Sequence, residues 1–151
     1  MKEFPNFQEL NVVHNYLVSN MPNSQTRIRK SGQGGIWSYS YAVREKLADG
    51  QYLETRTQVD RREYSMLMKT VDSAHFTIYQ KRRCFIWKNR YFRLDIYEEP
   101  CNPSCRGLIL LSTRSIDDQD LVVPSFIKVE RDVTSDQSYS MFNLSMKDNC
   151  K

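Results

Sequence analysis

The sequence predicts a mainly β protein (α+β) in which antiparallel strands close into a barrel and a few helices pack outside it. Three observations lead to this fold class. Most of the chain alternates apolar and polar residues, as in Ile36–Arg44 and Tyr52–Val59, which is the periodicity of strands. Short turn signals such as Asp49-Gly50 separate these segments, so neighbouring strands are expected to pair antiparallel. Helical spacing is confined to two segments, leaving seven or eight strands that are expected to close.

Length and composition limit the classes of protein. At 151 residues the chain is expected to form a single domain over 1–151, and its 40% hydrophobic content excludes a disordered chain. The net charge of +4 suits an anionic ligand but is too small to indicate a nucleic-acid polymer, which is not expected as a partner. The sequence has no apolar run of the ~20 residues that span a bilayer and no signal-peptide pattern. We therefore expect a cytoplasmic protein.

The N-terminal third sets up a charged sheet face. Residues 6–20 fit either a helical stripe or a short buried strand. In Thr26–Lys30, alternation places Arg27 and Arg29 on one face. Ile36–Arg44 has aromatic residues on one side, whereas the other side resembles the wall of a cavity because its residues are mostly small: Ser38, Ser40, Ala42 and Arg44.

The next segments predict a strand followed by a helix. Tyr52–Val59 reads as a strand whose polar face carries Glu54, Arg56 and Gln58. Asp60 then offers an N-cap with glutamate three residues later, and apolar residues follow at helical spacing. Residues 61–71 should form an amphipathic helix on the outside of the sheet.

A hairpin over Phe76–Pro100 is expected to turn at Lys88-Asn89. Arg82 lies on one face of its first strand, with Lys81 and Arg83 on the opposite face, and the second strand carries Arg93 and Asp95. We expect Arg82 to be the most important single cation for ligand binding. Its loss should leave the protein folded.

The C-terminal third predicts two more strands and a helix. Leu108–Arg114 should be a strand with Ser112 and Arg114 on one face, followed by an exposed acidic loop at 117–120. Phe126–Val133 is expected to be the last strand. Asp136 can begin a final helix that carries Tyr139, Met141, Phe142 and Leu144.

Cysteine usage favours reduced thiols. Cys101 and Cys105 have a spacing compatible with zinc, and His75 or Cys84 could complete such a site, but the sequence has no second close pair. We expect no metal site. A Walker-type phosphate loop and a Gly-x-Ser-x-Gly motif are both missing from the sequence.

Several segments together resemble the C-terminal domain of the TRPL translocation defect protein 14 family, a CYTH-like (triphosphate tunnel) fold. They occur along nearly the whole chain: TRIRK, YSYAVRE, ETRTQ, KRRCF, YFRLDIY, GLILLS and DVTSDQSYSMFNLS. The resemblance implies an eight-stranded closed tunnel in which basic residues bind polyphosphate and carboxylates hold Mg²⁺ or Mn²⁺. It also implies that the chain is the C-terminal part of a longer protein. Guanine-nucleotide binding, if it belongs to an N-terminal module, cannot be located in this chain.

Carried over residue by residue, the resemblance places an anion-binding set on the tunnel wall: Arg27, Arg29, Arg44, Arg56, Arg82, Arg93 and Arg114, supported by Glu54, Asp95 and Ser112. Two departures are evident. The opening Glu-x-Glu-x-Lys strand of the fold's enzymes corresponds to Leu10–His14, which has neither carboxylates nor lysine, and a later Glu-x-Glu corresponds to Ser112–Arg114. Two carboxylates are a poor ligand set for divalent metals.

These departures predict a noncatalytic domain that binds phosphoinositide headgroups or polyphosphate without a cofactor. The resemblance implies a role in ion-channel trafficking, with peripheral membrane association and trafficking partners of unknown identity. One alternative is a triphosphatase that uses Glu54 and Asp95 with Mg²⁺ or Mn²⁺. A second alternative is a protein-interaction module that uses the face carrying Trp37, Tyr39 and Tyr41, although such a face more often packs under helices.

Overall fold

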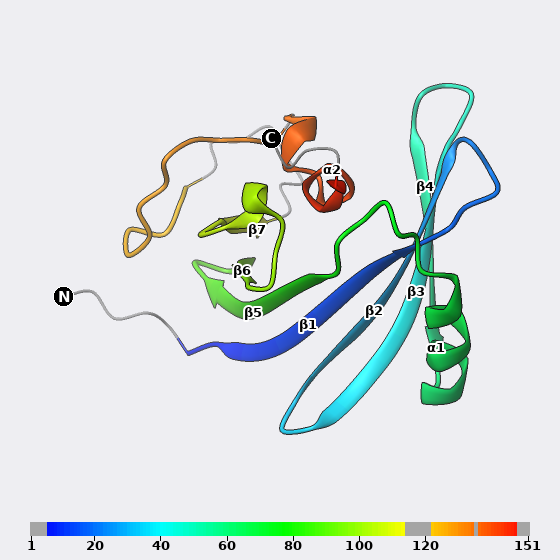
Figure 1. Cartoon of the computed structure of the whole chain (residues 1–151). Coiled ribbons are helices and arrows are strands. Elements are labelled where there is room, and N and C mark those ends of the chain that lie inside the picture. The colour runs from blue at the N-terminus through cyan, green and yellow to red at the C-terminus, as the bar shows by residue number, and fades with distance from the viewer. Residues whose placement is uncertain (1–5, 114–121, 135, 148–151) are drawn as a thin grey trace.

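The computed structural model describes residues 6–113, 122–134 and 136–147. These residues form one curved antiparallel sheet with short helices on both sides (Figure 1). The sheet has seven strands in the order β4-β3-β2-β1-β5-β6-β7. The elements are β1 Gln8–Leu17, β2 Ser24–Gln33, β3 Ile36–Lys46, β4 Tyr52–Val59, α1 Arg61–Leu67, η1 Met68–Thr70, β5 Ile78–Trp87, β6 Arg90–Glu98, η2 Pro103–Cys105, β7 Ile109–Thr113, η3 Gln137–Tyr139 and α2 Met141–Ser145.

The predicted barrel differs from this architecture in two ways. In the described residues the sheet has seven strands, not eight, and it is open, with β4 and β7 as its edges. The predicted last strand, Phe126–Val133, is a turn followed by irregular chain. Its consecutive apolar residues Phe126 and Ile127 both pack against one cluster, so they do not alternate between two faces as strand residues would. The expected acidic loop at 117–120 lies outside the described residues.

Pairing on both sides makes residues 8–17 a strand, which resolves the ambiguity of residues 6–20. This strand, β1, pairs with β2 along one edge and with β5 along the other. The predicted hairpin of β5 and β6 is also present. Its turn residues Lys88 and Asn89 have φ of 49° and 61°, the positive values that a two-residue hairpin turn of type I′ requires.

The outer face of the sheet is covered where α1 packs on it. Asp60 and Glu63 form the predicted capping box, and the helix predicted over 61–71 ends at Leu67 and continues as one 3₁₀ turn. Tyr39 and Tyr41 pack against the core beneath this helix, which weakens the alternative that their face meets a protein partner. The core cluster here consists of Leu17, Ile28, Val59 and Tyr64.

The inner face is the side of the sheet that bears Arg27 and is turned toward α2. At the β5–β7 end, apolar residues of the sheet pack there against η2 and α2, in a cluster of Ile78, Tyr97, Cys105 and Leu144. The side chain of Asn102 donates to the backbone oxygen of Leu144, and His75 Nδ1 lies 2.6 Å from Ser145 Oγ. The predicted final helix is thus present as η3 and α2. Among the described residues, no helix is long and apolar enough to cross a membrane.

Candidate functional site

The strand register brings six of the seven predicted arginines onto the inner face. Residues directly opposite each other across antiparallel strands share a face. Arg27 is opposite Ala42, which is opposite Arg56, and Arg29 is opposite His14. On the other half of the sheet, Arg82 is opposite Asp95. The inner-face set is Arg27, Arg29, Arg44, Arg56, Arg82 and Arg93 with Glu54, Asp95 and Ser112; Arg114 lies outside the described residues.

Arg29 lies at the centre of this cation cluster. Burial and the repulsion of neighbouring arginines, Arg56 foremost, lower the pKa of Arg29 from 12.5 to about 10. In the described part of the chain, no carboxylate lies within ion-pair distance of Arg29. An anion bound beside this guanidinium would offset both the burial and the repulsion.

Glu54 is loosely held between two arginines. Its Oε1 lies 3.5 Å from Arg27 Nη2 and its Oε2 lies 3.7 Å from Arg56 Nη2, both longer than good charge-assisted hydrogen bonds. The carboxylate is 43% exposed. Exposed ion pairs of this kind contribute little to stability, so anionic ligands can compete for these two arginines.

Asp95, in contrast, is buried between Arg82 and Arg93. Arg82 Nε donates to Asp95 Oδ1 at 2.8 Å, and Arg93 Nε lies 3.1 Å from Oδ2. The side chains of Asp95 and Arg82 are only 6% and 9% exposed. This pair revises the expectation that Arg82 is dispensable for folding, since removing one partner would leave a buried carboxylate short of a counter-charge.

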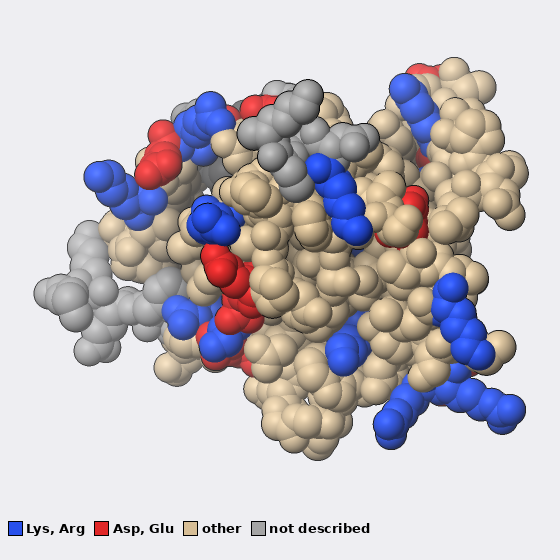
Figure 2. All heavy atoms as spheres, in the orientation of Figure 1, with Lys and Arg blue, Asp and Glu red and all other residues tan. Residues whose placement is uncertain are grey.

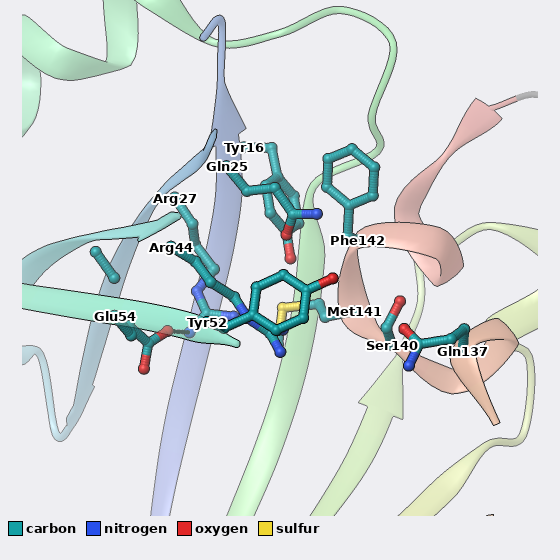
Figure 3. A pocket seen from close by; sticks show the side chains of 11 residues that line it. Tyr16, Gln25, Arg27, Arg44, Tyr52, Glu54, Gln137, Ser140, Met141 and Phe142 are labelled. Carbon is teal, nitrogen blue, oxygen red and sulfur yellow. Dashed lines mark ion pairs between the residues drawn. The ribbon is translucent and has the colours of Figure 1, made fainter. Parts of the chain in front are cut away.

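A pocket opens at the β2–β4 end of the inner face (Figure 3). Arg27 and Arg44 enter it from the sheet, and the Arg44 guanidinium lies 4.1 Å from the centre of the Tyr52 ring. The opposite wall comes from η3 and α2, where Met141 and Phe142 contribute side chains. The pocket has a volume of ≈ 140 Å³, well above the roughly 10–15 Å³ that one water needs.

Sequence reasoning missed most of this pocket. Tyr16 and Tyr52 could have been found by alternation, because each lies two residues from an inner-face residue, His14 or Glu54. The contribution of α2 could not have been found, since no local pattern places residue 142 opposite residue 27. The missed lining residues are Tyr16, Gln25, Tyr52, Gln137, Ser140, Met141 and Phe142.

Figure 2 shows basic side chains on the face in view, some of them adjoining one another at the lower right and others beside red carboxylates. Lys81 and Arg83 lie on the face opposite Arg82, as alternation predicts, and the structure makes this the outer face; Arg83 Nε donates to Glu9 at 3.0 Å.

A buried neutral pair lies on the inner face among these cations. His14 Nε2 lies 3.0 Å from Gln80 Oε1, and both residues are 1% exposed. Burial, followed by the charges of Arg27 and Arg82, lowers the pKa of His14 well below its usual 6.5. His14 Nδ1 and Gln80 Nε2 have no hydrogen-bond partner among the described residues.

The lowered pKa predicts a loss of stability in mild acid. A base whose folded pKa lies below its unfolded value binds protons preferentially when unfolded, so the free energy of unfolding should fall as the pH drops below about 6.5. His14 can contribute up to about 1.4 kcal/mol per pH unit. Chemical denaturation at a series of pH values from 7 to about 5 measures how the free energy of unfolding changes with pH. This change should be smaller for His14→Gln than for the wild type, because glutamine does not titrate. An unchanged slope would show that His14 is not held neutral. His75→Gln is the comparison: burial lowers the pKa of His75 as well, but that of His14 is lowered well below its usual value, so His75→Gln should flatten the slope less.

The described carboxylates do not fit a protein-held divalent metal. Glu54 and Asp95 each lie between two arginines, and the described residues contain no group of three His, Cys, Asp or Glu side chains that could hold an ion. Leu10 and Val12, at the positions of the missing carboxylates, share the inner face with His14. Magnesium needs several hard oxygen ligands, so most of them would have to come from a phosphate ligand and water.

The open antiparallel sheet with its cationic inner face defines a CYTH-like, or triphosphate tunnel, fold, and two solved structures support this class. One is described as the inorganic triphosphatase NE1496, with a TM-score of 0.63 and 17% identity, covering 96% of this chain and 87% of that chain. The other is described as the hypothetical protein NE1496, with a TM-score of 0.63 and 17% identity, covering 97% and 93%. At this identity the likeness establishes the fold. No protein-family model and no curated protein sequence matches the chain, so membership of the TRPL translocation defect protein 14 family is not shown.

Two predictions are corrected by this comparison. The sequence predicts a domain that is not an enzyme and needs no cofactor, because carboxylates of the fold's enzymes are missing. The similarity to a protein described as an inorganic triphosphatase overturns both predictions. The loss of some metal ligands does not by itself imply the loss of catalysis, because a dense cation cluster can stabilise charge on a reacting phosphoryl group.

Proposed function

We propose that this chain is a triphosphatase of the CYTH type, which binds a linear triphosphate along its inner face and hydrolyses a phosphoanhydride bond. The observation that carries the proposal is the convergence of six arginines from five strands, β2 to β6, on one face. The fold shared with a protein described as an inorganic triphosphatase supports the choice of reaction.

The arginines suit both binding and catalysis. Guanidinium groups bind phosphate oxygens bidentately, and phosphoryl transfer depends mainly on positioning and on stabilising charge spread over the equatorial oxygens. Arg29 is surrounded by other cations, and Arg27 and Arg56 are only loosely paired with Glu54. In the proposed reaction, water forms a new P–O bond to a terminal phosphorus while the bridging P–O bond breaks; phosphate and pyrophosphate are released, and the proton of the attacking water passes to solvent or to a phosphate oxygen.

Mg²⁺ or Mn²⁺ enters this proposal as part of the substrate, bound to phosphate oxygens. We assign no step to a metal held by the protein, because the described carboxylates are already paired with arginines. Glu54, which is more exposed and less tightly paired than Asp95, is the carboxylate of the inner face that is freer to move toward such a complex.

A second candidate ligand is a phosphoinositide headgroup, favoured by the excess of inner-face arginines over carboxylates, six against Glu54 and Asp95. Vicinal phosphates on an inositol ring present the same oxygens to guanidinium groups. The resemblance to the TRPL family, the position of the chain within a longer protein, the cytoplasmic location, the membrane association and the trafficking partner stay predictions.

Titration calorimetry with soluble ligands separates these candidates. We expect inorganic triphosphate with Mg²⁺ to bind the wild-type chain and to bind more tightly than pyrophosphate, which has fewer charged oxygens for the arginines. Binding of an inositol polyphosphate without any binding of triphosphate would favour the headgroup and contradict the triphosphatase. No heat with any of these ligands would contradict both.

A further inference from the structure

Strand β4 leaves one long edge of the sheet open. It is the end strand of the described sheet, and seven of its eight residues are exposed. The helix that follows does not cover this edge, because α1 packs on the outer face through Tyr64, whose ring centre lies 4.8 Å from that of Tyr39. The other edge strand, β7, has five residues in the described part of the chain.

This edge lacks several of the usual protections against pairing. Natural edge strands carry proline, charged side chains (lysine above all) or a bulge, or are covered by other segments; the charges of β4 are Glu54 and Arg56, of opposite sign. The sequence of β4, YLETRTQV, contains neither proline nor lysine, and its pairing with β3 runs without a bulge from Tyr52 to Val59. An exposed, regular edge of eight residues is a template for another strand.

The hairpin loop determines which backbone groups point outward. Leu47 N donates to Gln51 O, which makes these residues the first bonded pair of the β3–β4 hairpin. Bonded pairs alternate along an antiparallel ladder, so Leu53, Thr55 and Thr57 face β3 with their backbone groups. The alternate residues direct their N–H and C=O groups to the open edge: Tyr52, Glu54, Arg56 and Gln58.

A strand added to this edge must pair outward-facing residues with outward-facing residues. For a second β4 related by a two-fold axis, centring the pair on Glu54 or on Arg56 would put like charges opposite each other. Centring it on Thr55 instead places Glu54 of each copy opposite Arg56 of the other. Opposite charges directly across a strand pair stabilise it, and like charges destabilise it. The edge is therefore self-complementary in one register.

We propose that β4 pairs with β4 of a second copy of this chain, forming an antiparallel two-fold dimer centred on Thr55. The two inner faces then form one continuous surface. Arg56 of each copy lies beside Glu54 of the other copy. Glu54 lines the pocket at the end of the arginine cluster. The second copy thus contributes a cation to each site. This inference does not rest on the proposed enzymatic activity.

Charge reversal tests the register. We expect sedimentation equilibrium between about 1 µM and 1 mM to detect a dimer of the wild-type chain. Glu54→Arg should weaken it by about tenfold or more, because each substitution acts at two symmetric pairs. Arg56→Glu should do the same, and the double variant Glu54→Arg/Arg56→Glu should restore the dimer. Glu45→Arg, an exposed reversal on β3, is the matched control and should leave the dimer intact.

Cysteine cross-linking tests the centre of the pair. Two Thr55 side chains lie directly opposite each other in this register, within the distance that a disulfide requires, so Thr55→Cys should form a covalent dimer on oxidation. Thr57→Cys should not, since two such residues would be four positions apart along the strands, about 13 Å. The wild-type chain, which has only its native cysteines, is the background control for cross-linking. A monomer at every concentration, a dimer insensitive to both reversals, or equal cross-linking at 55 and 57 would overturn the proposal.

Discussion

Replacing Arg82 with alanine is expected to lower the free energy of unfolding by about 3–5 kcal/mol, the cost of breaking a buried ion pair from one side. Arg82 Nε donates to Asp95 at 2.8 Å, and the Asp95 side chain is 6% exposed, so the orphaned carboxylate cannot recover its hydration. Arg93 remains within ion-pair distance, which places the effect toward the lower end. A thermal melt should show the midpoint falling by about 10 °C.

The control for this effect removes both charges together. In Arg82→Met/Asp95→Leu both buried charges of the pair are removed, and Arg93, which loses its carboxylate, has a side chain that is 40% exposed, so much of the lost stability should return. Arg93→Ala, in which the lost side chain is 40% exposed, should cost much less. If Arg82→Ala melts at the wild-type temperature, the pair does not stabilise the fold, and Arg82 regains the ligand-binding role that the sequence predicts for it.

Replacing Arg29 with glutamine is expected to weaken triphosphate binding by about tenfold to a hundredfold. A hydrogen bond to a charged group contributes roughly 1.5–3 kcal/mol, and each 1.4 kcal/mol is a factor of ten in affinity. Arg29 is chosen because it lies centrally in the arginine cluster, with no carboxylate within ion-pair distance in the described part of the chain. Calorimetry with inorganic triphosphate measures the change.

The same substitution should have the opposite effect on the ligand-free protein. Because the folded pKa of Arg29, about 10, lies below its usual 12.5, its charge opposes folding at every pH below about 10. Arg29→Gln should therefore melt at a higher temperature than the wild type without anion. Lys30→Gln is the matched control: it removes the same charge one residue away, where Lys30 lies over the Trp37 ring. Equal loss of affinity in both variants would mean that net charge, not the inner face, binds the ligand.

Which residues of a strand share one face of the sheet could be predicted from the sequence, because alternation is a local property. Arg27 and Arg29 share one face of β2 in the structure, as the two-residue period requires. The Lys88-Asn89 turn and the capping box at Asp60 are also short-range features. Alternation alone could not say which faces of different strands coincide; the grouping of the seven arginines on one wall came from the family resemblance, and the strand register brings six of them together.

Features that depend on long-range contacts could not be predicted. The chain around Phe126 has strand-like residues, but its apolar side chains pack on the outer face beside Phe85 instead of entering the sheet, so the predicted eighth strand and closure were wrong. The burial of Asp95 against Arg82 depends on the register between two strands. The approach of Phe142 to Tyr16, with ring centres 5.2 Å apart, joins segments more than a hundred residues apart.

Phosphate release from inorganic triphosphate is the most direct test of the proposed function. The wild-type chain should release phosphate in the presence of Mg²⁺ or Mn²⁺, and chelation of the metal should stop it, because the cation enters with the substrate. Arg29→Gln should reduce kcat/KM by about tenfold or more, while Lys30→Gln should retain the wild-type rate. No phosphate release by the folded wild-type chain with either metal would contradict the proposal that this arginine-lined face hydrolyses triphosphates.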